Sequence, residues 1–359
     1  MLACLMAAAV GLACTQEAPD PGAQRTPTEE TPAEDPSTED PPPLADSPFA
    51  AIPDLVREIG PSTVAIELLI QQDGQTAEGA GSGVIWGSDG YIVTNAHVVL
   101  PAEEIVVILA DGARHDGQLL AADERTDLAV VRIDATGLPE AVFADELPEI
   151  GTLAVALGNP LGFQNTATVG IVSGVDRDLP VIPGAPPLVG LIQTDAAISS
   201  GNSGGALIDQ AGVVIGINTA VVDSQAAPGV AQGLGFAIPS TTVTPVIQQL
   251  IDDGEVAHAH LGIAGAPLTP QLAERFDIDR DRGVLIGTVQ PGSPADEAGL
   301  QQGDVIVALG DATIDTLGDL LGELRRYAPG DTVDVEVVRD GEERTETAVL
   351  GELPEDVPA

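Results

Sequence analysis

The chain has 359 residues, more than one typical domain, so two domains with flanking tails are expected. Its formal net charge is −43, from 56 acidic and 13 basic residues, and every basic residue is arginine. A surface this acidic repels nucleic acid and anionic membranes, which excludes nucleic-acid binding and leaves membrane contact only through an N-terminal lipid or anchor. The two cysteines, Cys4 and Cys14, precede the folded part, which therefore has neither a disulfide nor a thiol nucleophile.

The negative charge is not confined to one tail. Residues 15–46 contain nine acidic residues and one arginine, a net of −8 against −43 for the whole chain, so most of the charge lies in the folded domains. Such a surface keeps a protein soluble where salt screens its self-repulsion. Adaptation to high salt and compositional drift in a high-GC genome both explain it, and the sequence does not separate them.

Residues 1–14 are predicted to be a signal peptide. Residues 1–13 are uncharged and apolar, with a length that suits a signal peptide rather than a helix that crosses a bilayer. The sequence GLAC at residues 11–14 resembles a bacterial lipobox, although Gly11 replaces the usual bulky residue and a basic start is missing. We therefore expect Cys14 to be acylated, with a secreted or otherwise anchored protein as the alternative.

Residues 15–48 are predicted to be a disordered, extended tether. They are rich in proline, threonine and acidic residues and have almost no large apolar side chains. Such a segment buries too little apolar surface to offset the loss of chain entropy on folding. The folded part is therefore expected from residue 49, with residues 353–359 as a short tail.

Residues 49–239 predict a mainly β domain. Apolar residues at a helical spacing indicate a helix within residues 49–59. Short runs rich in β-branched residues then follow one another between turn residues, a pattern typical of two antiparallel barrels with a cleft between them. The segment 71–81 is expected to be a short connection. The predicted strands are 62–70, 83–86, 91–94, 105–109, 128–133, 153–157, 170–175, 190–194, 206–208 and 213–218.

Three motifs in this domain carry candidate catalytic residues. Ser203 lies in the run GNSGG, where glycines let the backbone approach a substrate and turn its amide groups toward one point. A serine hydroxyl is a poor nucleophile unless a histidine base and an orienting carboxylate accompany it. The chain offers His97 in TNAHVV and Asp127 in TDLAV. Taken singly, His97 also suits a packed strand end, and Asp127 suits a turn or cap.

The order His97, Asp127, Ser203 is that of chymotrypsin and differs from the orders in subtilisin and the α/β-hydrolases. The motifs TNAHVV, TDLAV and GNSGGAL resemble the HtrA (DegP/DegS-like) family of serine proteases, and the resemblance extends from about residue 49 to residue 350. It implies a mainly β fold, a chymotrypsin-like double antiparallel β-barrel followed by one PDZ domain. The short segment 71–81 is similar to family members that lack a long loop there.

Residues 240–255 predict a helix with one apolar face, ended by Gly254, and we expect it to link the two domains. Residues 256–352 show the pattern of one PDZ domain, an α+β module. The resemblance implies that Leu261, Gly262 and Ile263 bind the C-terminal carboxylate of a peptide. A helix within residues 316–327 would flank the peptide groove, although core packing alone explains most of its leucine stripe.

The resemblance implies a serine endopeptidase that needs neither ATP nor a cofactor. Ser203 would attack a peptide carbonyl while His97 takes its proton and Asp127 orients the imidazole. The amide groups of Gly201 and Ser203 would form the oxyanion hole. The stretch 217–221 would line the primary specificity pocket, and small aliphatic side chains are expected there because no acidic residue is placed to receive a basic one.

Two departures and one match concern the residues before the nucleophile. Ser199 and Ser200 replace the residues more usual in the family, which leaves the rigidity of this loop in doubt. Asp195 matches an aspartate of the family that lies outside the specificity pocket. The reaction itself does not depend on these positions.

The resemblance also implies partners and a location. Substrates would be unfolded or exposed polypeptides of the bacterial cell envelope, cleaved for quality control or stress signalling by a homotrimer. The apolar stripe of residues 49–59 would supply subunit contacts or pack on its own domain. Arg177 aligns with the arginine through which the family senses its PDZ domain, and the alternative is a solvated arginine beside a PDZ domain that only tethers substrate.

Two other functions fit parts of the sequence. A PDZ-bearing chaperone or scaffold would use the protease fold only to bind polypeptide, and the intact triad argues against it. An unrelated hydrolase such as an esterase is disfavoured by the order of the triad and by the PDZ pattern. His258 and His260 form a pair without a further Cys/His cluster, so neither a metal nor another cofactor is expected.

Overall fold

The computed structural model describes residues 49–72, 75–159, 166–179, 188–199, 201–221, 234–276 and 278–354. The chain from Pro48 onward forms one compact unit. The predicted signal peptide, Cys14, the predicted tether of residues 15–48 and Ser200 lie outside the described residues. Within the described part, no helix has the length and apolar character needed to cross a bilayer.

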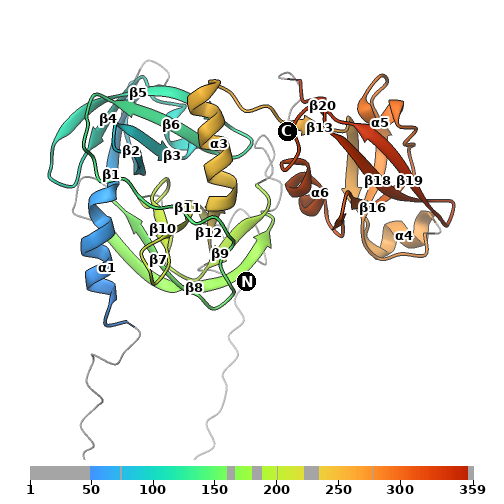
Figure 1. The fold of residues 1–359 in the computed structure, drawn as a ribbon, viewed down its shortest axis with the longest axis horizontal. Coiled ribbons are helices and arrows are strands. Elements are labelled where there is room, and N and C mark those ends of the chain that lie inside the picture. The colour runs from blue at the N-terminus through green and yellow to red at the C-terminus, as the bar shows by residue number, and fades with distance from the viewer. Residues whose placement is uncertain are drawn as a thin grey trace, which may run out of the picture. The chain divides into compact units, whose positions relative to one another are not determined.

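The first barrel contains six antiparallel strands, closed in the order β1-β2-β3-β6-β5-β4 (Figure 1). Its interior is filled by aliphatic side chains on alternate strand positions, such as Val64, Ile66 and Leu68 of β1. The strands are β1 (Thr63–Gln72), β2 (Gln75–Gly87), β3 (Tyr91–Thr94), β4 (Glu104–Ile108), β5 (Arg114–Asp123) and β6 (Leu128–Ile133).

The second barrel is also closed and antiparallel, in the order β10-β11-β12-β9-β8-β7. Its buried side chains join those of the first barrel in one apolar core, where Val84 and Leu128 meet Leu157 and Ile217. The predicted double barrel is therefore confirmed. The strands are β7 (Leu153–Gly158), β8 (Thr166–Arg177), β9 (Leu191–Thr194), β10 (Ala206–Ile208), β11 (Val214–Val221) and β12 (Gly235–Pro239).

Two strands and one hairpin differ from the expectation. β5 is polar along most of its exposed face, and β12 is a short buried run, so neither stood out from its surroundings. The segment 71–81 is not a loop, because β1 and β2 pair as far as Gln72 and Gln75. The first barrel thus extends into residues that the sequence pattern assigned to a connection.

Among the described residues, two short helices and a 3-10 turn precede or interrupt the strands of the first barrel. In α1 (Ile52–Ile59), Leu55 is buried and the rest of the apolar stripe packs against the shared core. The apolar stripe of α1 therefore packs on its own domain, and a subunit contact stays a prediction. A 3-10 turn, η2 (Gly60–Ser62), joins α1 to the first strand, and α2 (Ala96–Val99) is a single turn after β3.

The predicted linker helix, α3 (Ser240–Asp252), begins after Pro239 and packs closely on the barrels. Val243, Ile247 and Leu250 are fully buried in the shared core, and α3 contacts β5 and β6 of the first barrel and β11 and β12 of the second. Its apolar face is therefore explained by packing. The helix carries the chain from the barrels to the second domain.

The second domain is a small α+β unit with its own core. Its main sheet has the order β14-β15-β16-β18-β19, with β17 paired to β16, and β13 pairs with β20. Helix α6 starts with a capping box, in which Thr316 and Asp319 exchange hydrogen bonds with each other's backbone. The elements are β13 (Ala259–His260), β14 (Ile263–Pro267), α4 (Pro270–Phe276), β15 (Val284–Val289), α5 (Pro294–Glu297), β16 (Val305–Leu309), β17 (Ala312–Thr313), α6 (Leu317–Leu324), β18 (Thr332–Arg339), β19 (Glu342–Val349) and β20 (Gly351–Glu352).

Candidate active site

His97 and Asp127 come from neighbouring elements of the first barrel. His97 lies in α2, directly after β3, and Asp127 ends the turn between β5 and β6. Asp127 has φ +57°, a left-handed conformation that few non-glycine residues adopt. Its carbonyl accepts hydrogen bonds from Asn95 Nδ2 at 3.0 Å and from the Ala96 amide at 3.2 Å, which hold the turn in this conformation.

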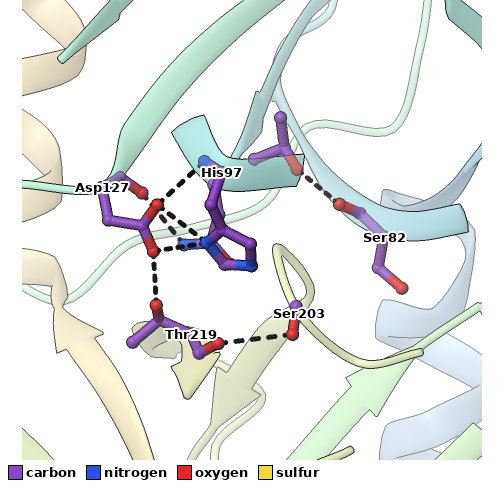
Figure 2. Close-up of polar contacts among 7 residues, drawn as sticks. Ser82, His97, Asp127, Ser203 and Thr219 are labelled. Carbon is purple, nitrogen blue, oxygen red and sulfur yellow. Dashed lines mark hydrogen bonds and ion pairs between the residues drawn. The ribbon is translucent and has the colours of Figure 1, made fainter. Parts of the chain in front are cut away.

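The Asp127 carboxylate contacts both the imidazole ring and the backbone amide of His97 (Figure 2). The imidazole Nδ1 lies 2.8 Å from each carboxylate oxygen, and the His97 amide donates to Oδ1 at 3.0 Å. The Asp127 side chain is 10% exposed and the imidazole 52% exposed, so the carboxylate stands behind a ring that faces solvent. Because Nδ1 donates to the carboxylate, Nε2 is left as the acceptor that a general base needs.

Ser203 lies on a tight loop that only glycines permit. Gly204 has φ +82°, and a Cβ at this position would lie 2.2 Å from Ser82 O. A Cβ at Gly205 would lie 2.1 Å from Leu157 O. The glycines therefore allow the loop to press against both barrels, as the GNSGG run indicated.

The Ser203 hydroxyl donates to Thr219 O at 3.3 Å, so proton transfer to His97 requires it to change its acceptor. Thr219 also donates from Oγ1 to Asp127 Oδ2 at 2.5 Å (Figure 2). Thr219 thus contacts two members of the predicted triad. The sequence placed it only in a pocket wall, and nothing in the wording of residues 217–221 signalled this contact.

Buried polar contacts order the residues before Ser203. Asn202 is 1% exposed, donates from Nδ2 to Ala197 O at 3.0 Å, and accepts from Ser199 Oγ at 3.0 Å. Ser199 replaces a residue more usual in the family, but its hydrogen bond to Asn202 stabilises this loop. Asp195 accepts from the Ile171 amide at 2.7 Å, which is a bracing contact between strands.

A second aspartate braces the turn that carries Asp127. Asp123 accepts from Thr126 Oγ1 at 2.5 Å, from the Thr126 amide at 3.2 Å and from His258 Nε2 at 3.0 Å. Burial alone would raise the pKa of Asp123, but the hydrogen bonds and the charge of His258 outweigh it and lower the pKa. His258, which the sequence raised as half of a metal pair, is thus engaged with this carboxylate, and the described residues hold no group of three or more His, Cys, Asp or Glu side chains suited to a metal.

The predicted carboxylate-binding loop lies beside an apolar groove of about 180 Å³. Gly262 has φ +78°, and its carbonyl accepts from the Gln290 amide at 2.9 Å. Leu261, Gly262 and Ile263 line the groove together with Leu321 and other leucines of α6. An extended peptide beside β14 would find apolar side chains on one wall and backbone amides at one end.

Arg177 is the last residue of β8, and its exposed side chain lies against Gly174 of the same strand. Another arginine connects the two domains. Arg325, which follows α6, donates to Val189 O at 3.2 Å and to Arg125 O at 3.3 Å. Arg125 belongs to the turn between Asp123 and Asp127, so this contact reaches the segment that presents the predicted triad carboxylate.

Comparison with known proteins assigns each of the two domains to a family. Residues 81–217 match the model of the trypsin-like peptidase domain, and residues 259–349 match the PDZ domain. A probable periplasmic serine endoprotease, DegP-like, of Halomonas elongata is 40% identical over 276 residues, which cover 77% of this chain and 57% of the relative. The putative serine protease HhoB of Synechocystis is 40% identical over 290 residues, which cover 78% of this chain and 68% of HhoB.

A solved structure, the HtrA-type protease AlgW with a tripeptide, superposes with a TM-score of 0.70 at 36% identity, covering 84% of this chain and 97% of that chain. The chain thus spans little more than half of the first relative but nearly all of the AlgW chain. The domain order and the barrel topology agree with both kinds of match. The chain belongs to the HtrA family of trypsin-like serine proteases with a PDZ domain.

Proposed function

We propose that this protein is a serine endopeptidase that cleaves unfolded or exposed polypeptides without ATP. The observation that carries the proposal is the contact of both Asp127 carboxylate oxygens with His97 Nδ1 at 2.8 Å, on a domain whose Ser203 loop matches the trypsin-like peptidase model. The pair leaves Nε2 free to act as a base, which an esterase or protease nucleophile needs. Triad order and family membership select the protease.

In the proposed reaction, His97 Nε2 takes the proton of Ser203 as its Oγ attacks the peptide carbonyl. The tetrahedral intermediate collapses to an acyl-enzyme when the protonated His97 gives its proton to the leaving amine. Water then attacks the ester by the same route and releases the new carboxylate. Asp127 stabilises the imidazolium in both steps, and the amides of Gly201 and Ser203 receive the oxyanion, a contact worth about 3–4 kcal/mol per donor in comparable sites.

The primary specificity pocket is proposed to accept small aliphatic side chains. Ile217 and Asn218 are fully buried, and Asn218 Nδ2 donates to Leu157 O and Ala206 O rather than into a pocket. A peptide library with one varied residue before the scissile bond tests this. Preference for Val or Ala over Arg and Phe supports the proposal, and a basic preference contradicts it.

A labelling experiment tests the activity itself. A fluorophosphonate probe should modify the wild-type protein once per chain, and Ser203→Ala should abolish both labelling and casein cleavage while leaving the fold and peptide binding intact. A chaperone or scaffold has no reason to react with the probe. Casein cleavage by Ser203→Ala above background would reject Ser203 as the nucleophile.

The location is proposed to be the bacterial cell envelope. Curated relatives are named periplasmic endoproteases. Acylation of Cys14 would hold the enzyme at a membrane, with the acidic segment 15–48 as tether, and lasting attachment needs more than a single acyl chain. Cys14→Ser should move the protein from the membrane fraction to the soluble fraction, and equal partitioning of both forms would reject the lipid anchor.

A homotrimer is proposed from the family alone. The stripe of α1 is occupied by its own core, whereas Phe49 just before it remains 57% exposed. Sedimentation of wild type and Phe49→Ala, with Phe49 as a candidate subunit contact, tests the assembly. A wild-type monomer would reject it.

The PDZ domain is proposed to bind C-terminal peptides and to regulate cleavage, with Arg177 as the sensing residue. The similar protease AlgW has been solved with a decapeptide and with a tripeptide, which supports peptide binding. Coupling of groove and active site should be modest, about 1–3 kcal/mol. Arg325 offers a second route, because it contacts the turn beside Asp127.

A small reporter peptide that cannot reach the groove separates regulation from tethering. It would be assayed with and without a separate C-terminal peptide in wild type, Arg177→Ala and Arg325→Ala. Stimulation in wild type that vanishes in Arg177→Ala supports the proposal, and loss only in Arg325→Ala moves the role to that residue. Equal rates throughout would leave the PDZ domain as a tether.

A further inference from the structure

Ser82 lies where the first barrel meets the Ser203 loop, and the reaction described above gives it no role. It belongs to β2 and is fully buried, at 0% exposure. Its neighbours are glycines: a Cβ at Gly81 would lie 2.6 Å from a methyl of Val98, and one at Gly83 would lie 2.6 Å from Ile92. The strand therefore runs too close to its surroundings for side chains on either side of this serine.

Four hydrogen bonds converge on Ser82. Its hydroxyl donates to Gly201 O at 2.8 Å and accepts from the Asn159 amide at 2.8 Å. Its amide donates to Ser203 O at 2.9 Å, and its carbonyl accepts from Thr94 Oγ1 at 2.7 Å. Figure 2 shows Ser82 near the site with its carbonyl bond. One residue of the first barrel thus holds two carbonyls of the nucleophile loop, 119 and 121 residues further along the chain.

The hydroxyl fixes the first of two peptide planes. In a trans peptide the carbonyl and the following N–H point in opposite directions. Ser82 holds the Gly201 carbonyl at one edge of this plane, and at the opposite edge the Asn202 N–H donates to Ser199 O at 2.8 Å. The plane between residues 201 and 202 is therefore held at both ends.

The amide of Ser82 fixes the plane that follows the nucleophile. It holds the Ser203 carbonyl, and on the opposite side the Gly204 N–H donates to Asn218 O at 2.8 Å. The peptide plane of residues 202 and 203 lies between the two planes already described. It carries the Ser203 N–H, and at its opposite edge the Asn202 carbonyl accepts from the Gly205 amide at 2.8 Å. The direction of the Ser203 N–H thus follows from planes that are fixed on either side of it.

We propose that Ser82 is a positioning residue that aims the Ser203 N–H, and the adjoining Gly201 segment, at the oxyanion. The inference rests on the proposed protease activity. Without the hydroxyl, Gly201 O loses its donor from the first barrel, and the plane before Asn202 is held only by the bond from the Asn202 N–H to Ser199 O. The Ser203 N–H is then less well oriented before the reaction, and orienting it during the reaction costs free energy. This weakens binding of the transition state more than binding of the substrate.

The test compares Ser82→Ala with a matched control. Ser240→Ala also removes a buried serine hydroxyl that donates to a main-chain carbonyl, Val214 O at 2.6 Å, at the start of α3. For each full-length protein the reactive fraction is titrated to its end point with a fluorophosphonate. Then kcat and KM for a small reporter peptide and Ki for a matched peptidyl boronic acid, which forms a tetrahedral serine adduct, are measured per reactive site.

For Ser82→Ala we expect kcat per reactive site to fall about 10- to 100-fold, less than the roughly 100- to 1,000-fold typical of deleting an oxyanion donor outright. The boronate Ki should rise by the same factor while KM stays within about twofold, and Ser240→Ala should match wild type in all three quantities. A purely structural role would lower the titrated fraction without changing the constants of the sites that remain.

Three results would overturn the inference: wild-type constants in Ser82→Ala, a fall in kcat without a change in boronate Ki, or a merely smaller reactive fraction. If Ser82→Ala does not fold, Ser82→Cys, which fills the site with a somewhat larger side chain and a weaker donor, is judged by the same three quantities. If wild type itself neither labels nor cleaves, the protease assignment fails instead, so the two failures are distinguishable.

Discussion

Thr219 joins the two ends of the predicted triad: its hydroxyl donates to Asp127 Oδ2 at 2.5 Å while its carbonyl accepts from Ser203 Oγ at 3.3 Å. The carboxylate that steadies His97 is therefore itself steadied by the second barrel. The same residue gives the serine hydroxyl a resting acceptor.

Replacing Thr219 by valine keeps the shape of the side chain and removes the donor. A hydrogen bond to a charged group is worth about 1.5–3 kcal/mol, so kcat should fall roughly 10- to 100-fold with little change in KM. Thr219→Ser keeps the hydroxyl and should stay near wild type. Steady-state kinetics on a reporter peptide decide the matter, and equal rates for Thr219→Val and wild type would show that Asp127 does not depend on this bond.

Gly204→Ala should destabilise the fold by several kcal/mol, because a left-handed conformation costs a non-glycine residue about 1–2 kcal/mol and the new Cβ would also lie 2.2 Å from Ser82 O. Gly112→Ala is the matched control. Gly112 has φ +86° with nothing within 4 Å of a Cβ, so it bears only the conformational cost. Urea unfolding of both variants measures the difference, and equal losses would show that the loop yields to the added methyl.

Asp123→Asn tests the turn that presents Asp127. The pKa of Asp123 is lowered in the folded protein, so its carboxylate adds stability above its unfolded pKa of about 4, and this stability is lost as the pH falls through the lowered folded value. At pH 7 we expect Asp123→Asn to lower the free energy of unfolding by about 1–3 kcal/mol. The difference from wild type should shrink below about pH 4.

Asp209→Asn serves as a control for this experiment, since Asp209 also accepts two amides of its own turn, those of Ala211 and Val213. Unfolding curves across the pH range are compared for all three proteins. A difference between wild type and Asp123→Asn that does not change with pH would contradict the assignment of the stabilisation to the ionised carboxylate.

The PDZ groove should require a free peptide carboxylate. A peptide with an apolar C-terminal residue should bind the wild-type protein, and its C-terminal amide should bind at least about tenfold more weakly, because a charge-assisted contact to backbone amides is lost. Gly262→Ala should weaken binding of the acid form, since the added Cβ would lie 2.3 Å from Ser293 Cβ. Titration calorimetry measures both, and equal affinities for acid and amide would place the peptide end elsewhere.

How far the sequence predicts this structure depends on whether a feature is local. β3, β6 and β10 agree with the predicted runs at both ends, because each is a short, largely apolar segment bounded by turn residues. β5 escaped notice because half of it faces solvent with polar side chains. The stripe of residues 49–59 contains a helix, α1 (Ile52–Ile59), but its periodicity alone does not distinguish a subunit contact from packing on its own core.

The residues of the candidate site likewise divide into those with a local sequence motif and those defined by distant contacts. His97 and Asp127 were identified from motif wording and order, and the structure brings them together. The sequence does not predict the roles of Thr219, Asp123 and Ser82, because their contacts join residues far apart in the chain. A threonine, an aspartate or a serine in such a setting belongs to no recognisable sequence motif. Such roles depend on which backbone atoms the fold brings within reach.

The bond between Ser82 and Gly201 bears on when activity first arises during synthesis. The hydroxyl and its acceptor are 119 residues apart, and those of Thr219 and Asp127 are 92 apart, so neither contact exists in a chain that has left the ribosome only as far as the first barrel. A half-made or truncated chain would carry histidine and aspartate without an aimed nucleophile. Competence to cut would therefore arrive with completion of the second barrel, which spares the cell a protease that acts before its own folding is finished.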